Sequence, residues 1–171
     1  QLTMQAWIKT TNTYYQQGLI QKIQYWSAGW CFDLEGGRFS AGFGTPTGMI
    51  GWKITSKIIN DGQWHHVAGV VNLSNNSLRL YVDGVAQSFD ITGVTSLSST
   101  NPLLIGFYTN SAYLFDGSLD EVALWNRTLN DTEIMTLYQI GVEGFTSIPE
   151  PSGLMMLICF ILCYGIMKRL M

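Results

Sequence analysis

One stretch near the middle of the chain, residues 61–85, constrains the fold more than any other. It opens on an Asp-Gly pair, and two segments of alternating side chains, 65–71 and 78–82, follow with an Asn-Asn-Ser turn between them. Strict alternation puts the odd-numbered residues of the first segment on one face of a strand and the even-numbered residues on the other. Asp83-Gly84 then supplies the positive φ angles of a type I′ hairpin turn. Two antiparallel strands punctuated in this way fix their own register, so that neighbouring strands can add to them.

The composition agrees with a chain built from strands and turns. Charged residues make up only 12% of the 171 residues, whereas aromatic residues make up 13% and 18 residues are glycine. This balance is typical of an all-β, turn-rich domain. The formal net charge of -3 comes without a basic stripe, which argues against nucleic acid as a partner. Cys31 is separated from Cys159 and Cys163 in an apolar tail, so we expect no disulfide within the domain.

Further strands and one helix can be placed along the chain. The helix signal is a capping box, with Asn130 as the N-cap and Glu133 three residues on, and Gly141 stands where a helix stop belongs. In the last strand we expect Glu121 to share a face with Leu119, opposite Asp120. The expected strands beside the central pair are 3–9, 19–24, 31–34, 38–43, 49–54, 103–107 and 119–125.

Two motifs in the right order carry a family resemblance over residues 2–141. Residues 64–68 followed by 80–84, and later 115–127 with 129–134, resemble the laminin-G-like, concanavalin A-like jelly-roll family. The resemblance implies an antiparallel jelly-roll β-sandwich closed by a short helix, usually a binding module on an exported protein. The chain starts at Gln1 without an initiator Met. We therefore expect residues 1–144 to be an N-terminally truncated laminin-G-like domain, preceded in the full protein by an export signal, with or without an edge strand.

The C-terminal segment predicts where the protein goes. A linker, 145–152, contains a Pro-Glu-Pro motif, and 153–171 is an apolar segment with a basic end, which we expect to form a hydrophobic helix. From Leu154 that helix is only about 21 Å long against a hydrocarbon core of roughly 30 Å, so it predicts a marginal transmembrane anchor. Cations at its end stay cytoplasmic and leave the domain outside.

This arrangement resembles the PEP-CTERM sorting signal. The resemblance implies a Gram-negative bacterium that builds extracellular polysaccharide. It also implies export, transient anchoring in the inner membrane, cleavage by an exosortase-type processing enzyme, and release to or retention at the cell surface. An ordinary C-terminal anchor is the alternative. The residues of the proposed signal are Pro149, Glu150, Pro151, Lys168 and Arg169.

No motif for catalysis or for a metal is found. Asp120 and Glu121 are adjacent, and neighbours in a strand point to opposite faces, so they cannot act on one substrate as acid and base. The Glu-x-Asp-x-x-Glu pattern of sandwich glycosidases is absent, and the nearest pair, Asp33 and Glu35, runs into a turn. The two histidines, at positions 65 and 66, also face opposite ways. We expect a protein that is not an enzyme and has no metal or other cofactor.

Two loops are the candidate ligand site. In pentraxin-like relatives the corresponding loops, here 25–30 and 108–116, supply acidic side chains to calcium, but Asp116 is the only carboxylate across both. Backbone carbonyls with Asn110 leave a weaker calcium site open. The loops instead carry aromatic rings, which stack on the apolar faces of sugars when exposed and complete the core when buried. The candidate ligand-binding residues are Tyr25, Trp26, Trp30, Tyr108, Asn110 and Tyr113.

Three functions follow from these features. The first is an exported, non-catalytic module that binds carbohydrate of the cell surface or of the extracellular (biofilm) matrix. The alternative is a protein–protein adhesion or structural matrix module without sugar binding, with a surface protein as the partner. An accessory domain of a glycosidase or lyase is the third. Exposed rings on the two loops favour the first function, and buried rings favour the second.

Overall fold

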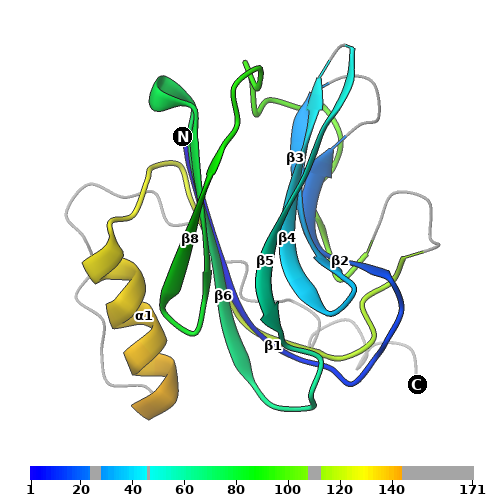
Figure 1. Cartoon of the computed structure of the whole chain (residues 1–171), viewed down its shortest axis with the longest axis vertical. Helices are drawn as coiled ribbons and strands as arrows, with labels where there is room; N and C mark the ends of the chain where they lie inside the picture. Colours follow the sequence, from blue (N-terminus) through cyan, green and yellow to red (C-terminus); the bar gives the residue numbers. More distant parts are fainter. Residues whose placement is uncertain (24–27, 46, 108–112, 144–171) are drawn as a thin grey trace, which may run out of the picture.

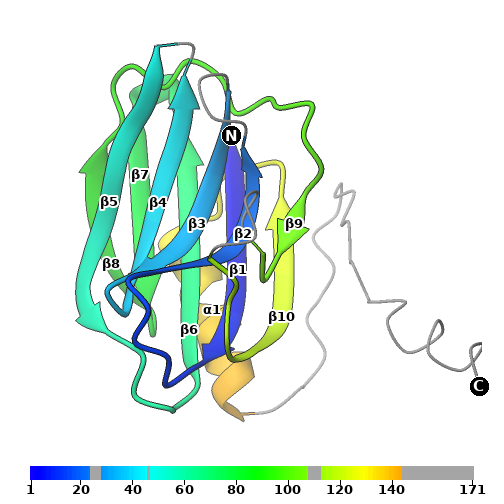
Figure 2. The same ribbon diagram turned by 90° about the vertical axis from the view of Figure 1, so that its right-hand side faces the viewer.

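Two five-stranded antiparallel sheets pack face to face in the computed structural model (Figure 1), which describes residues 1–23, 28–45, 47–107 and 113–143. The first sheet has the order β10-β1-β6-β7-β8, and the second has the order β5-β4-β3-β2-β9 (Figure 2). The strands of the first sheet are β1 (Leu2–Lys9), β6 (His65–Asn72), β7 (Ser77–Val82), β8 (Val85–Asp90) and β10 (Ser118–Trp125). Those of the second are β2 (Gln16–Ile23), β3 (Gly29–Glu35), β4 (Arg38–Thr45), β5 (Gly48–Ile58) and β9 (Leu104–Ile105). The fold is therefore the all-β sandwich that the sequence predicts.

The central pair of strands has the predicted register and faces. β6 and β7 are paired and are connected by a short 3-10 helix, η1 (Leu73–Asn75). A tight turn at Asp83-Gly84, with φ angles of 50° and 77°, connects β7 to β8, with which it also pairs. The apolar odd-numbered residues of β6 lie in the core between the sheets, and the even-numbered ones face outward. Alternation along β1 is likewise confirmed, because Met4, Ala6 and Ile8 are buried in the core. Phe32 and Phe39 from the second sheet stack at 5.9 Å within the same core.

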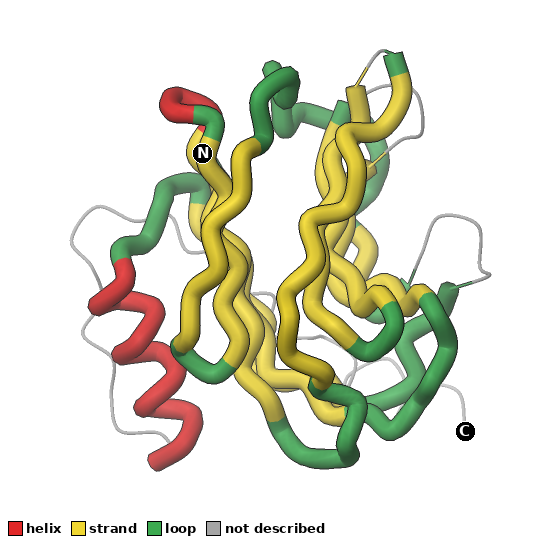
Figure 3. The backbone as a smooth tube through the Cα atoms, viewed as in Figure 1, coloured by secondary structure: helices red, strands yellow, loops and turns green. Residues whose placement is uncertain are grey.

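One helix, α1 (Asp131–Glu143), covers the outer face of the first sheet, on the side away from the second sheet (Figure 3). Its capping box is confirmed, since the Asn130 N–H donates to Glu133 Oε2 at 2.8 Å and the Glu133 N–H donates to Asn130 Oδ1 at 2.9 Å. The predicted stop at Gly141 is wrong, because α1 continues to Glu143. Gly141 instead lets the indole of Trp7 lie against the helix, where a Cβ would overlap the Trp7 Nε1 atom.

A bulge in β10 overturns the predicted alternation of the last strand. Gln5 of β1 pairs with Ala123 and Trp7 pairs with Asp120, so two β10 residues, Glu121 and Val122, stand opposite one residue of β1. Glu121 takes a φ of 48°, in the left-handed region that few non-glycine residues adopt. Because of the extra residue, Leu119 packs against the core whereas Asp120 and Glu121 both lie on the outer face. Leu119 and Glu121 therefore do not share a face.

Some predicted elements change length or lie outside the described residues. The strand expected at 103–107 is paired only over Leu104–Ile105, and the strand expected at 49–54 extends over Gly48–Ile58. No helix in the described part of the chain has the length and apolar character needed to cross a bilayer. The predicted C-terminal hydrophobic helix, the linker and the sorting residues lie in 144–171, outside the described residues.

Candidate ligand-binding site

Residues that flank the two predicted aromatic segments are bonded to strand β2. Ile23 at the end of β2 pairs with Gly29 at the start of β3, on either side of segment 24–27. Both ends of segment 108–112 are bonded to the same strand, because the Gln21 side-chain amide donates to the Phe107 carbonyl and the Gly18 N–H donates to the Tyr113 carbonyl at 2.9 Å. These anchors span six residues of one strand, Gly18 to Ile23, or about 17 Å. The described residues on either side of the two predicted segments therefore lie along β2 of the second sheet.

Two of the six candidate ligand-binding residues are described by the structure. Trp30 is only 4% exposed and packs in the core, with its ring 5.7 Å from that of Phe32, so the structure places it with the core and not on a binding surface. Tyr113 is 37% exposed beside β2. The remaining candidates, Tyr25, Trp26, Tyr108 and Asn110, lie outside the described residues.

Two carboxyl groups share the outer face of β3, next to β2. Asp33 and Glu35 are separated by one residue, so they point to the same side of the strand, away from the core residues Phe32 and Leu34. Asp33 is fully buried and accepts a hydrogen bond from Gln16 Nε2 at 3.4 Å. The sequence contains this signal, since an Asp-x-Glu pair in a strand must face one way. We expected no site at this pair, because it runs into the turn after Glu35.

Burial controls the protonation of this pair. Removal from water raises the pKa of Asp33 to about 8, so this carboxyl group is mainly neutral at pH 7. Burial also raises the pKa of Glu35, although the hydroxyl of Tyr15 donates to Glu35 and partly offsets that rise. The negative charge of Glu35 in turn raises the pKa of Tyr15, whose ring is 74% exposed. An exposed aromatic ring is thus held beside a carboxylate at the rim of this face.

Three buried side-chain oxygen atoms on this face lack a hydrogen-bond partner within the described part of the chain. They are Gln21 Oε1, Asp33 Oδ1 and Glu35 Oε2. A buried acceptor without a partner costs free energy, so such atoms are rare and mark places where water or a ligand supplies the donor. Cys31 lies in the same row, and burial raises the pKa of its thiol well above the usual value, which leaves it unreactive.

The described residues contain no group of three or more His, Cys, Asp or Glu side chains placed to hold a metal ion. Asp116, the one carboxylate of the two loops, accepts from Asn12 Nδ2 at 2.9 Å. The two central histidines face opposite ways, as predicted. His65 bonds Asp83 at 2.8 Å and Asp61 at 3.1 Å, whereas His66 is buried on the outer face and bonds Gln5 at 2.9 Å.

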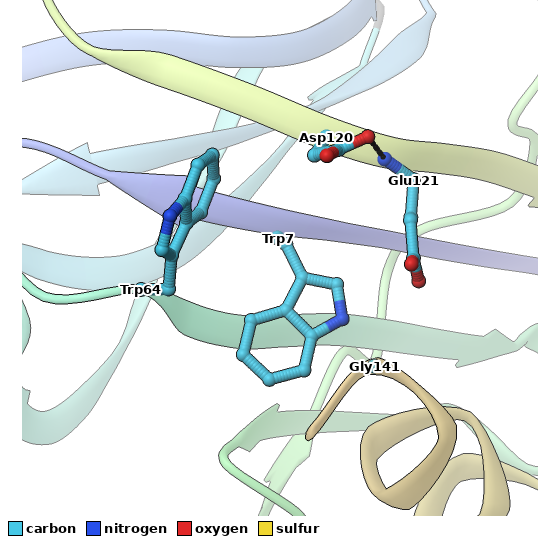
Figure 4. Close-up of a pocket in the computed structure, with 5 residues that line it drawn as sticks. All are labelled: Trp7, Trp64, Asp120, Glu121 and Gly141. Carbon is cyan, nitrogen blue, oxygen red and sulfur yellow. Dashed lines mark hydrogen bonds between the residues drawn. The ribbon is translucent and has the colours of Figure 1, made fainter. Parts of the chain in front are cut away.

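A second concave site lies on the other sheet. Figure 4 shows a cleft lined by Trp7, Trp64, Asp120, Glu121 and Gly141. The bulge in β10 directs both carboxylates into it, which corrects the expectation that they point to opposite faces. The bulge cannot be read from the apolar residues of β10, because all four residues from Val122 to Trp125 are apolar and so do not reveal which face each one takes.

Comparisons with known proteins agree with this architecture. A family model described as the concanavalin A-like lectin/glucanases superfamily matches residues 1–135. Among solved structures, the botulinum neurotoxin serotype D binding domain is 16% identical at a TM-score of 0.63, covering 82% of this chain and 36% of that chain. The binding domain of Paraclostridial Mosquitocidal Protein 1 is 20% identical at a TM-score of 0.63, covering 80% and 36%. The heptameric SAP-like pentraxin from Limulus polyphemus is 17% identical at a TM-score of 0.65, covering 81% and 69%.

These structures share the jelly-roll fold, and the chain spans little more than a third of the two toxin domains. No curated protein sequence matches the chain. The match of the family model over most of the chain decides the assignment. The chain belongs to the concanavalin A-like lectin/glucanases superfamily.

Proposed function

We propose that this domain is an exported, non-catalytic module that binds extracellular carbohydrate. The observation that carries the proposal is that residues flanking the aromatic segments 24–27 and 108–112 are bonded to one strand, β2, beside the exposed ring of Tyr113. Sugar rings stack on exposed aromatic faces, and the ring of Tyr113 is 37% exposed.

The same face argues for binding over hydrolysis. A glycosidase needs two carboxyl groups that reach the scissile bond. Asp33 has no exposed surface and Glu35 is 4% exposed, so neither carboxyl group is open to a substrate. We therefore expect no turnover of bound glycan by the domain.

Glycan binding by the full chain tests the proposal. Trp26→Ala combined with Tyr108→Ala removes two rings from the two segments, and we expect at least tenfold weaker binding on a glycan array and by calorimetry. Tyr14→Ala, which removes a 69% exposed ring outside the segments, is the matched control and should bind normally. Undiminished binding by the double variant would show that the site lies elsewhere, and hydrolysis of a bound glycan would overturn the non-catalytic assignment.

A second candidate function is adhesion to a surface protein or assembly in a matrix. The observation in its favour is the edge strand β5, where Ile54 is 37% and Ile58 is 53% exposed. Exposed apolar side chains on an edge strand provide a template for another chain. Absence of any glycan binding together with self-association that Ile58→Lys abolishes would favour this function.

We also propose that residues 144–171 direct export from a Gram-negative bacterium. The support is the sequence pattern of Pro149-Glu150-Pro151, an apolar segment and the basic pair Lys168-Arg169. An exosortase-type enzyme would cleave near the Pro-Glu-Pro motif after transient anchoring in the inner membrane. The intact mass of the mature surface protein tests this, and a mass that retains Lys168 and Arg169 would show an ordinary anchor instead.

A further inference from the structure

Each sheet has two edge strands, and among the described strands three of these four edges carry a feature that opposes the addition of another strand. An edge exposes unpaired N–H and C=O groups, and proteins protect such edges with bulges, charged residues or very short strands. β5 has two shifts in register against β4 and carries Lys53 and Lys57. β10 has a bulge beside Asp120 and Glu121, and β9 is only two residues long.

β8 is the edge strand that has none of these features. It pairs with β7 over six residues without a shift in register, and its sequence contains no lysine, arginine or proline. Within the described part of the chain, nothing pairs with its other edge. Figure 2 shows β8 and β5 on the same side of the sandwich, but they belong to different sheets. A regular edge without protection is a template for a further strand.

The pairing with β7 determines which backbone groups of β8 remain free. Val82 and Val85 flank a two-residue turn, so they form a hydrogen-bonded pair, and such pairs recur at every second residue of an antiparallel ladder. The odd-numbered residues of β8 therefore bond β7, and the N–H and C=O groups of the even-numbered residues point to the free edge. These residues are Ala86, Ser88 and Asp90.

Side-chain contacts hold β8 in place without using this edge. The Gln87 side chain crosses to β5, where its Oε1 atom accepts from the Ser56 N–H at 3.1 Å and its Nε2 atom donates to Ser56 Oγ at 2.6 Å. Lys57 Nζ lies 2.5 Å from Asp83 Oδ2 at the turn before β8. The strand is ordered before a partner arrives, which lowers the entropy cost of pairing.

The sequence of β8 is compatible with a second copy of itself. Two copies related by a two-fold axis at Ser88 run antiparallel, with Ser88 opposite Ser88 and Ala86 opposite Asp90 of the other copy. The free N–H and C=O groups then meet in hydrogen-bonded pairs. Asp90 is the one charged residue of the strand, and it meets an alanine, so no like charges stand opposite each other.

An exposed valine at the start of β8 gains apolar cover in the same register. Val85 is 68% exposed, and it lies on the core side of the sheet because it pairs with Val82. The two-fold axis places it opposite Ile91 of the second copy, a residue that is buried in the core. We propose that two copies of this chain pair through β8, so that their first sheets join into one continuous antiparallel sheet.

Disulfide trapping in the full chain tests both the pairing and its register. Ser88→Cys is made together with Cys159→Ser and Cys163→Ser, which leaves only the buried Cys31 as a second thiol. In the proposed register the Cα atoms of the two new cysteines lie about 5.5 Å apart, within reach of a disulfide. We expect mild oxidation to convert most of the protein into a covalent dimer. Ala86→Cys in the same background is the matched control, because its two thiols lie about 13 Å apart along the strands, and it should stay monomeric.

Analytical ultracentrifugation measures the association without a cross-link. We expect a reversible dimer with a micromolar Kd. Ser88→Lys places two ammonium groups opposite each other and should raise the Kd at least tenfold. Ser98→Lys, at another exposed serine, should leave it unchanged. A mild detergent is present throughout, so that the apolar segment 153–167 contributes equally to wild type and variants.

A wild-type monomer at submillimolar concentration would overturn the inference. So would equal cross-linking of Ser88→Cys and Ala86→Cys, or an unchanged Kd for a Ser88→Lys variant with the wild-type circular dichroism spectrum. Ile58→Lys should leave this dimer intact, which distinguishes it from self-association through β5. Trp26→Ala with Tyr108→Ala should also dimerise normally, which separates the dimer from the proposed carbohydrate site.

Discussion

Asp33 is a carboxyl group with no exposed surface, held beside Gln16 on the outer face of β3. Its burial is costly only in the ionised form, and this is why its pKa is raised to about 8. Sequence alone shows that Asp33 and Glu35 share a face. It cannot show how deeply they are buried, because the depth depends on residues that are distant in the chain.

We predict that Asp33 makes the domain less stable as the pH rises. The folded state holds this proton up to about pH 8, whereas the unfolded chain loses it near 3.8, so the folded state binds more protons between these values. The contribution of Asp33 to the free energy of unfolding is therefore fully present below pH 3.8. It falls by on the order of 5 kcal/mol as the pH rises to 8. Urea unfolding at pH 5 and pH 8 measures the loss, and Asp33→Asn should remove it.

The comparison must be made between wild type and variant, because another buried group acts in the opposite direction. Burial lowers the pKa of His66 to about 4, so its contribution is present above pH 6.5 and is lost as the pH falls. The same pH dependence in Asp33→Asn as in wild type would contradict the prediction.

At the level of single elements, α1 shows what local sequence can and cannot specify. Its start follows from Asn130 and Glu133, because both halves of the capping box lie within one turn. Its end does not follow from Gly141, which is a glycine for a tertiary reason, the close approach of Trp7. The β10 bulge is a similar case, since it is stabilised by Gln5 of another strand.

Gly141→Ala separates these two roles of glycine. In an exposed helix interior this change stabilises by about 1 kcal/mol. Here the new Cβ would overlap Trp7 Nε1, and the indole is fixed by its stack on Tyr138, so we expect the variant to be less stable than wild type. The midpoint of urea unfolding measures the sign.

Gly51→Ala is the control for Gly141→Ala, because a Cβ at Gly51 meets nothing within 4 Å. A Gly141→Ala variant more stable than wild type would show that Trp7 moves freely and that the cleft is not rigid. Since Gly141 lines the cleft, the variant should also alter the near-ultraviolet circular dichroism of Trp7.

On the scale of the whole molecule, the sandwich was predictable because its alternating pattern is repeated in several strands. The alternation of side chains predicted which residues of β1, β6 and β7 face the core. The Asp83-Gly84 and Gly36-Gly37 pairs predicted where two hairpins turn. The grouping of the two aromatic segments on β2 and the cleft beneath α1 were not predictable. They depend on pairing between strands far apart in the chain, such as β1 with β10.

The distance between the two sheets is set at one point by a glycine. A Cβ at Gly69 of β6 would overlap the ring of Phe32 of β3, so the ring of one sheet fills the space that the glycine leaves in the other. Nothing in the local sequence of β6 requires glycine there, because its φ is not in the left-handed region. The glycine serves the packing of the sheets.

We predict that Gly69→Ala destabilises the fold by about 1–3 kcal/mol, the usual cost of an overpacked core. Phe32→Leu alone also destabilises, because it leaves a cavity. In the double variant the smaller side chain makes room for the new methyl group, so the loss should be less than the sum of the two single losses, with a coupling of at least about 0.5 kcal/mol. Urea unfolding of the four proteins measures this coupling. Additive losses would mean that the sheets move apart freely and that Gly69 does not set their spacing.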